Sequence, residues 1–166
     1  MSSLFVLGGA RSGKSRLAQQ RAESLPGRLI FIATAQAFDA EMHERIARHR
    51  AGRDQRWTTI EAPLDLLPAI EAQRGAIVLV DCLTLWTSNL MLAEHDIEQA
   101  VEALAQAVRS FDGHLILVAN EVGLGIVPDN ALARRFRDEA GRVNQAIAAA
   151  ADEVVLTVAG LPLRLK

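Results

Sequence analysis

Short apolar runs alternate along the chain with longer segments in which apolar residues recur every three or four positions. The runs are rich in Val, Ile and Leu without polar alternation, which is typical of strands buried on both faces of a parallel sheet. They predict strands at residues 4–7, 29–33, 77–80, 115–119 and 154–158, and more weakly at 58–60. The longer segments predict helices at residues 14–24, 40–50, 64–73, 97–111 and 130–151.

This alternation of strands and helices predicts a doubly wound α/β fold with a mainly parallel sheet. Residues 163–166 predict a short last strand, with a hairpin over residues 160–162. The chain shows no internal repeat, low-complexity tract or linker, and its 166 residues suffice for one core. We therefore expect a single domain over residues 1–166.

Half of the residues are hydrophobic and 23% are charged, which is an ordinary globular balance. The formal net charge of −2 excludes a global basic field for nucleic acid, and the absence of Tyr argues against a base-stacking surface. The single cysteine, Cys82, excludes an internal disulfide and fits a reducing compartment. Because the sequence shows neither a secretory signal nor an apolar stretch of membrane-spanning length, we expect a cytoplasmic protein. Trp57, Trp86 and Cys82 are expected to be packing residues.

A glycine-rich segment follows the first predicted strand and precedes the first predicted helix. It fits the pattern G-x-x-x-x-G-K-[ST] and reads Gly8, Gly9, Ala10, Arg11, Ser12, Gly13, Lys14 and Ser15. Glycines let the backbone turn tightly and point N–H groups at an anion, and the helix N-terminus adds its positive dipole end. Lys14 is expected to reach the β- and γ-phosphates of a nucleotide, and the Ser15 hydroxyl to bind Mg²⁺. The alternative is a glycine turn with a surface lysine. With this motif, the expected fold is a phosphate-loop NTPase of the RecA-like type.

The strand predicted at residues 77–80 is followed by Asp81. In phosphate-loop enzymes an aspartate at this place lies beside the loop and binds Mg²⁺, directly or through water. Many strands end in an aspartate that only caps the next helix. Because the glycine-rich loop is present, we expect the metal role.

Arginines and histidines concentrate in residues 40–53. His43 and Glu44 begin like the zinc-protease pattern H-E-x-x-H, but position 47 is Ala47, so that interpretation fails. His43 and His49 are six positions apart and fall on different helix faces, which disfavours a shared metal. Two interpretations stay open: a solvated basic helix face, or a helix that handles anions, with arginines on phosphates and a histidine as nucleophile. The arginines are Arg45, Arg48, Arg50 and Arg53.

The segment 120–128 follows the strand predicted at residues 115–119 and therefore lies where α/β sheets place ligand loops. Its two glycines and the polar pair Asn120 and Glu121 suggest a shaped binding loop, and a plain connection is the alternative. Arginines follow within residues 133–142. They could close over substrate phosphates, or form a solvated helix face.

Several classes of nucleotide-binding protein fit less well. A regulatory GTPase would carry D-x-x-G and N-K-x-D, but residues 81–84 lack the glycine and residues 120–123 lack the lysine and the aspartate. A motor ATPase usually needs a larger chain with coupling elements. A simple small-molecule kinase and a non-enzymatic nucleotide-binding module both remain as alternatives. A small-molecule kinase or nucleotidyltransferase gives every motif a role, because phosphoryl transfer is mostly positioning and charge stabilisation.

Over essentially its whole length the chain resembles the bifunctional adenosylcobinamide kinase / adenosylcobinamide-phosphate guanylyltransferase family of cobalamin biosynthesis. The resemblance rests on an ordered set of motifs, in which each fragment is modest and the whole is specific. These are residues 8–15, 32–36, 41–42, 45–46, 49–50, 53, 57, 120–128, 132–134, 136–138 and 140–145.

The resemblance implies two reactions. ATP or GTP first phosphorylates the aminopropanol hydroxyl of adenosylcobinamide, and GTP then donates GMP to that phosphate, giving adenosylcobinamide-GDP and pyrophosphate. The second reaction passes through a GMP-histidine, and by position in the Arg-Ile-x-x-His motif that histidine is His49. Family members resemble trimers with the nucleotide site near a subunit boundary, which implies a homo-oligomer.

The same resemblance implies further site residues. Arg50 and Arg53 are candidates for phosphate contacts, within a nucleotide-binding stretch that includes Ala51 and Gly52. Around the guanine nucleotide the resemblance places Thr34, Ala35, Gln36 and Glu61. The corrinoid is expected over part of residues 120–142, and Lys14 and Mg²⁺ are expected to stabilise the departing pyrophosphate.

Overall fold

A computed structural model describes residues 2–36 and 54–166 and confirms the expected doubly wound α/β fold. The described strands build a seven-stranded sheet in the order β3-β2-β4-β5-β1-β6-β7. All neighbouring strands are parallel except β7, which pairs antiparallel with β6. The strands are β1 (Ser2–Gly8), β2 (Leu29–Ala33), β3 (Trp57–Glu61), β4 (Ile77–Asp81), β5 (His114–Asn120), β6 (Glu153–Val158) and β7 (Leu161–Arg164).

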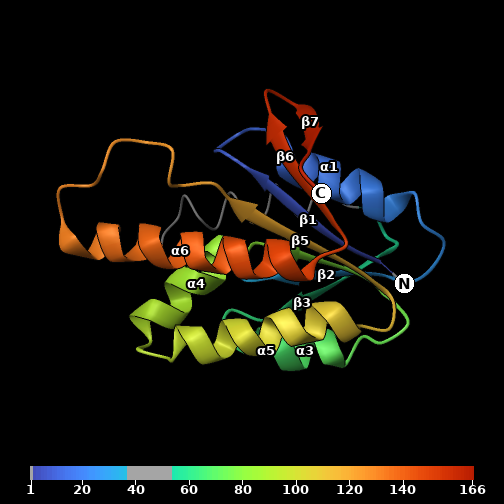
Figure 1. Ribbon diagram of the computed structural model, residues 1–166. Coiled ribbons are helices and arrows are strands. Elements are labelled where there is room, and N and C mark those ends of the chain that lie inside the picture. Colours follow the sequence, from blue (N-terminus) through green and yellow to red (C-terminus); the bar gives the residue numbers. More distant parts are fainter. Residues whose placement is uncertain (1, 37–53) are drawn as a thin grey trace.

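Helices cover both faces of this sheet (Figure 1). Among the described helices, α1 packs on one face and the other four on the opposite face. They are α1 (Lys14–Glu23), α3 (Leu66–Glu71), α4 (Leu83–Leu92), α5 (Ile97–Ser110) and α6 (Ala131–Ala150). None of these helices is both long and apolar enough to cross a membrane.

Two hydrophobic clusters fill the space between the helices and the sheet. Alternate residues of each central strand belong to opposite clusters, as the two-residue period of a strand requires. In β1, Leu4 and Val6 pack with α1, whereas Phe5 and Leu7 pack on the side of α3 to α6. Because both faces are covered, the strands lack polar alternation, which is the pattern the sequence shows.

Side-chain caps fix where two of the helices begin. Asp96 accepts a hydrogen bond from the Gln99 amide at the start of α5, and Asn130 accepts one from the Ala133 amide at the start of α6. Each cap binds an N–H group that has no partner within its helix. The caps hold both helices at the boundaries expected from the sequence, to within a residue or two.

Some predicted elements differ from the observed ones. Helix α4 was not expected, and α3 is shorter than the predicted residues 64–73. The hairpin expected at the C-terminal end is present, but its turn is at residues 159–160 and β7 already begins at Leu161. The helix expected at residues 40–50 lies outside the described residues.

A short polar tether joins the start of β1 to the segment before β6. The Asp152 carboxylate accepts hydrogen bonds from the Ser3 amide and the Ser3 hydroxyl, both at 2.8 Å. The Ser3 hydroxyl oxygen accepts in turn from the Asp152 amide at 2.9 Å. These bonds lower the pKa of the Asp152 carboxyl, because the backbone and hydroxyl donors of Ser3 stabilise the charged form.

Candidate functional site

The phosphate loop, residues 8–15, connects the carboxyl end of β1 to the first turn of α1. Its backbone is held internally, since the Ser12 amide donates to the Gly9 carbonyl at 3.3 Å. It is also held from outside, because the Gly160 amide in the turn between β6 and β7 donates to the Ser12 carbonyl at 2.8 Å. The loop is therefore a fixed cradle at the carboxyl edge of the sheet.

Glycine is required at two positions of this loop. A Cβ on Gly8 would lie 2.8 Å from the Thr157 carbonyl oxygen, which is part of the adjacent strand. Gly13 has φ +93°, a left-handed conformation, and a Cβ there would lie 3.2 Å from the Gly160 Cα. Both sites thus need the absence of a side chain, as the motif predicts.

Lys14 begins α1 and is 9% exposed. Its ammonium donates to the Gly9 carbonyl at 3.1 Å, so the side chain folds back over the loop. The first turn of α1 adds its N-terminal N–H groups and positive dipole end at the same place. The arrangement concentrates positive potential where a bound phosphate would lie.

The alternation of side chains brings further polar residues to this place. In each parallel strand the residue two positions after a residue that packs with α1 also faces α1. By this rule Asp81 follows Leu79, Asn120 follows Val118 and Thr157 follows Val155, and all lie on the face of α1 at the carboxyl edge. The phosphate loop lies on the same face because it leads from β1 into α1.

Three buried polar side-chain atoms in the described residues have no hydrogen-bond partner in the protein: Ser12 Oγ, Asp81 Oδ2 and Thr157 Oγ1. All three belong to this carboxyl edge. Such atoms are rare in folded proteins because an unpaired buried polar group is costly. Their concentration here is typical of a site built for a ligand.

The residues present fit a magnesium ion. Asp81 offers a carboxylate oxygen without a protein partner, and Ser15 carries a hydroxyl in the first turn of α1. Within residues 2–36 and 54–166 no three His, Cys, Asp or Glu side chains form a cluster that could hold a metal. This donor set suits Mg²⁺, which usually binds one or two protein oxygens together with substrate phosphates and water.

Asp81 ends β4, which is separated from β1 and the phosphate loop by one strand of the sheet. β5 lies between β4 and β1, so Asn120 pairs with Gly8, and Asp81 pairs with Val118. Two strand spacings, about 10 Å, therefore separate the ends of β4 and β1. The residues beside the root of the loop are Asn120 on the β5 side and Thr157 on the β6 side, since both pair with Gly8.

Thr34 acts as a structural link at the end of β2. Its hydroxyl donates to the Cys82 carbonyl at 2.7 Å and accepts from the Cys82 amide at 2.9 Å. The Asn89 side chain donates to the Thr34 carbonyl at 2.8 Å. Thr34 is fully buried, and its hydroxyl fixes the residue that follows Asp81.

The other residues expected around the guanine nucleotide share the same edge of the sheet. Ala35 and Gln36 follow β2 and are half-buried, and Glu61 ends the edge strand β3. These three residues lie at strands further from the loop than β4. His49, Arg50, Ala51, Gly52 and Arg53 lie outside the described residues, and Gln36 is the last described residue before them.

The segment after β5 is attached to the loop at its start. The Glu121 amide donates to the Gly8 carbonyl at 3.1 Å, and the Glu121 carboxylate accepts from the Gly123 amide at 2.6 Å. The chain then extends away from the sheet before α6 begins (Figure 1). Leu124 is 86% exposed and Ile126 is 98% exposed, so this segment presents large apolar side chains to its surroundings.

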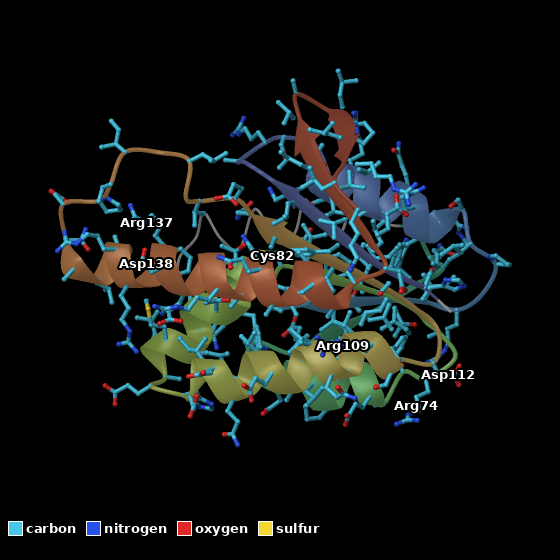
Figure 2. The ribbon with its side chains drawn as sticks, viewed as in Figure 1. Arg74, Cys82, Arg109, Asp112, Arg137 and Asp138 are labelled. Carbon is cyan, nitrogen blue, oxygen red and sulfur yellow. The ribbon has the colours of Figure 1, made fainter. Side chains whose placement is uncertain are left out.

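The arginines of α6 interact with their own surroundings. Arg134 donates to the carbonyls of Pro128 and Asp129. Arg137 pairs with Asp138, near the beginning of the helix in Figure 2, and Arg142 pairs with Glu139. Three of the four arginines in residues 133–142 therefore have partners within the described part of the protein.

Cys82 and the tryptophans are packing residues, as expected. Burial, together with the charge of Asp81, raises the pKa of the Cys82 thiol to about 11. Trp86 is buried and donates to the Leu64 carbonyl. Trp57 packs edge-on against Phe31 and donates to Glu23 of α1.

Comparison with known families gives a match over nearly the whole chain. The family described as cobinamide kinase / cobinamide phosphate guanyltransferase matches residues 4–165. A bifunctional adenosylcobalamin biosynthesis protein of Pseudomonas aeruginosa is 50% identical over 166 residues, covering 98% of this chain and 96% of the relative. One of Salmonella typhimurium is 41% identical over 180 residues, covering 98% and 99%.

Solved structures share the fold at low identity. A protein of Pyrococcus horikoshii OT3 has a TM-score of 0.60 at 10% identity and covers 99% of this chain and 86% of its own. The flagellar accessory protein FlaH from Methanocaldococcus jannaschii has a TM-score of 0.55 at 15% identity, covering 99% and 78%. A type III secretion ATPase also has 0.55 at 15%, covering 93% and 50%. These likenesses show the phosphate-loop NTPase fold alone.

Proposed function

This chain belongs to the cobinamide kinase / cobinamide phosphate guanyltransferase family, and we propose that it catalyses both reactions on adenosylcobinamide at one phosphate loop. ATP or GTP phosphorylates the aminopropanol hydroxyl, and GTP then transfers GMP to the resulting phosphate. The observation that carries the proposal is the loop itself, with Lys14 folded over it and three unpartnered polar atoms gathered at its edge of the sheet.

The loop amides and Lys14 hold the β- and γ-phosphates. Ser15 and Asp81 are the residues that would hold Mg²⁺. When bound, Mg²⁺ neutralises charge that develops on the phosphate oxygens. Because Lys14 and the N-terminus of α1 are fixed before the nucleotide arrives, they need little rearrangement as that charge develops.

We assign the guanylyl transfer to His49, on the resemblance of its motif to the family's. A neutral imidazole nitrogen forms a bond to the α-phosphorus of GTP, and the bond from that phosphorus to the bridging oxygen breaks as pyrophosphate leaves. A phosphate oxygen of cobinamide phosphate then attacks the same phosphorus, and the phosphorus–nitrogen bond breaks, restoring His49. On the same resemblance we propose that Arg50 and Arg53, with Ala51 and Gly52 between them, bind these phosphates.

We also place the guanine nucleotide near Ala35, Gln36 and Glu61. Support comes from their position at the carboxyl edge, where α/β sheets bind ligands. For Thr34 we propose an indirect role, because its hydroxyl is hydrogen-bonded to both the amide and the carbonyl of Cys82. It supports Asp81 from the neighbouring strand.

The corrinoid is proposed to lie against residues 120–142. The exposed side chains of Leu124, Ile126 and Val127 support this, because a corrinoid offers a broad, partly apolar surface. The segment begins at Glu121, whose amide is bonded to the loop, so a molecule resting on it can bring its hydroxyl to the nucleotide. Replacing Ile126 by Ser is expected to raise the KM for cobinamide and to leave the Kd for GTP unchanged.

We extend the proposal to assembly and compartment. By analogy with the family, the protein forms a homo-oligomer, with a trimer as the expected state, and it works in the cytoplasm. The single cysteine, which is buried, fits a reducing compartment. Light scattering of the purified protein measures the state directly.

The experiment that tests the function is incubation with Mg²⁺ and GTP labelled at the α-phosphate, followed by denaturation. A label that survives alkali but is lost in acid identifies a phosphoramidate, and replacing His49 by Ala should abolish it. Absence of label despite measured GTP binding would favour a simple small-molecule kinase or a non-enzymatic binding module. A label that persists in the His49 variant would move the nucleophile to another residue.

A further inference from the structure

We propose that Asn120 contacts the γ-phosphoryl group of the bound nucleoside triphosphate and serves the kinase reaction. The inference deepens the proposed function and rests on it for the identity of the nucleotide site. It concerns a residue whose place beside the loop follows from the sheet order and was not evident from its motif.

Asn120 lies directly beside the root of the phosphate loop. It ends β5, the strand inserted between β1 and β4, and it pairs with Gly8 at the root of the phosphate loop. Val118, two positions earlier, packs in the cluster on the α1 face, so the Asn120 side chain also faces that side. Val118 is apolar and fully buried, so Asn120 is the polar side chain at the carboxyl end of β5 on the α1 face.

The loop, Lys14 and Asp81 together set the direction in which the bound phosphates run. The loop amides surround the α- and β-phosphates, and the lysine reaches the β- and γ-phosphates. An aspartate at the position of Asp81 acts on the cation that bridges β- and γ-oxygens. The γ-phosphoryl group therefore lies between the loop and Asp81. Because β5 lies between β1 and β4 in the sheet, this group lies near the carboxyl end of β5.

The backbone of Asn120 is held by side chains from two helices. β4 ends level with Val118, so the Asn120 backbone has no strand partner on that side. Two buried side chains replace it: the Thr84 hydroxyl accepts from the Asn120 amide at 2.6 Å, and the Asn144 side chain donates to the Asn120 carbonyl at 3.3 Å. Helices α4 and α6 thus both contribute a buried polar group to fix one residue.

The Asn120 side-chain amide, by contrast, makes no hydrogen bond to any residue in the described part of the chain. An amide group can donate two hydrogen bonds and accept others without adding charge. A fixed backbone with an uncommitted donor beside the loop is suited to bind a phosphoryl oxygen. Such a donor strengthens the transfer when it is preorganised.

In the kinase reaction the substrate oxygen forms a bond to the γ-phosphorus, and the bond from that phosphorus to the β-bridging oxygen breaks. The nucleoside diphosphate leaves, and the hydroxyl proton passes to water. The Asn120 side-chain amide donates a hydrogen bond to an oxygen of the γ-phosphoryl group during the transfer. In guanylyl transfer the reacting phosphorus is the α-phosphorus, at the other end of the triphosphate, so Asn120 should matter less.

The test compares the binding of a non-hydrolysable ATP analogue and of ADP by calorimetry, with Mg²⁺ and with EDTA. Asn120→Ala should weaken the analogue about tenfold to a hundredfold, the range for a hydrogen bond to a charged group, and change ADP less than twofold. Asn120→Asp should weaken the analogue further, because a carboxylate repels the γ-phosphate. Gln106→Ala, which removes an exposed amide on α5, is the matched control.

Equal losses for the analogue and ADP in Asn120→Ala would overturn the proposal and make Asn120 a structural residue. Unchanged binding of both would overturn it as well. Thr84→Val should reproduce the selective loss of the analogue, and Thr84→Ser should restore it; a loss of ADP binding in Thr84→Val counts against the positioning role. Because binding needs no corrinoid, the result stands apart from whether the wild-type protein phosphorylates cobinamide.

Discussion

The Gly160 amide donates to the Ser12 carbonyl at 2.8 Å, so the turn between β6 and β7 braces the phosphate loop. Gly160 itself has φ +80°, a left-handed conformation. Its Cα would lie 3.2 Å from a Cβ on Gly13. The last hairpin of the fold therefore forms one wall of the candidate site.

Gly160→Val should damage nucleotide binding as well as stability. A β-branched residue with positive φ lowers the stability of the fold by about 1–2 kcal/mol. At residue 160 the backbone that is strained is the one whose amide donates to the Ser12 carbonyl. Gly75→Val is a matched control, because Gly75 has φ +74° and a Cβ built there would meet no atom within 4 Å. Thermal melts should show a similar loss of stability in both variants. A nucleotide Kd that rises equally in both would contradict the bracing role.

Lys14→Ala should weaken triphosphate binding about tenfold to a hundredfold, since a charged hydrogen bond to phosphate is lost. Both the kinase and the guanylyl-transfer activities should fall further, because Lys14 acts on charge that grows during each reaction. Arg74→Ala removes the same charge far from the loop, near the lower edge of Figure 2, and should leave both activities intact. Normal turnover of either reaction in the Lys14 variant would contradict a shared phosphate loop.

Asp81→Asn should raise the Mg²⁺ concentration needed for half-maximal turnover. The melting temperature should not fall, because Asp81 Oδ2 is buried without a partner and the carboxylate is costly to the fold. Asp112→Asn, at the exposed loop labelled in Figure 2, serves as the control for loss of one negative charge. An unchanged Mg²⁺ requirement would reduce Asp81 to a structural residue.

The Cys82 thiol should resist alkylation in the native protein at pH 8. Burial raises its pKa from 9.0 to about 11, so the reactive thiolate is about a hundredfold scarcer than in the unfolded chain. The raised pKa stabilises the fold below pH 9, and that contribution is lost as the pH rises toward 11. Mass spectrometry after iodoacetamide treatment, with and without urea, measures the difference. Equal labelling in both conditions would contradict the buried environment.

Asp152→Asn should reduce the pH dependence of stability in acid. The pKa of the Asp152 carboxyl is lowered by the Ser3 donors, so its contribution is present above pH 3.8 and is lost as the pH falls through the lower folded value. Melting temperatures between pH 3 and pH 7 should therefore converge for the variant and the wild type at the acid end. Asp65→Asn, where the side chain makes no capping bond, is the control.

Features set by neighbouring residues were predictable from the sequence. The predicted bounds of β2 are those observed, because its apolar run is sharply limited on both sides. The phosphate loop was predicted residue by residue, since its glycines serve local geometry and Lys14 begins the helix that follows. Helix α4 was missed because it is apolar on several faces, with Leu83, Trp86, Leu90 and Met91 all buried, and so lacks a helical period of polar residues.

Features set by distant pairing could not be predicted in this way. The insertion of β5 between β1 and β4 depends on which strands pair, and it brings Asn120 next to Gly8 and leaves Asp81 two strands from β1. Thr84, Asn144 and Thr157 were not singled out as site residues, because the residues around each of them carry no local signal of a partner in a distant element. The hydrogen bonds between the Thr34 hydroxyl and the Cys82 backbone likewise depend on the pairing of β2 with β4, which the sequence does not show.

β1 precedes every other described element in the chain, yet its two neighbours in the sheet are β5 and β6. Ser2 pairs with His114, and Ser3 bonds Asp152, which is 149 positions later. During synthesis β1 emerges from the ribosome before β5 and β6, so it cannot pair with either strand until most of the described chain has been synthesised. A nascent chain that stops before β6 therefore carries the complete phosphate-loop motif but cannot form the cradle, and it can acquire affinity for nucleotide only after β6 and the turn at Gly160 have been synthesised.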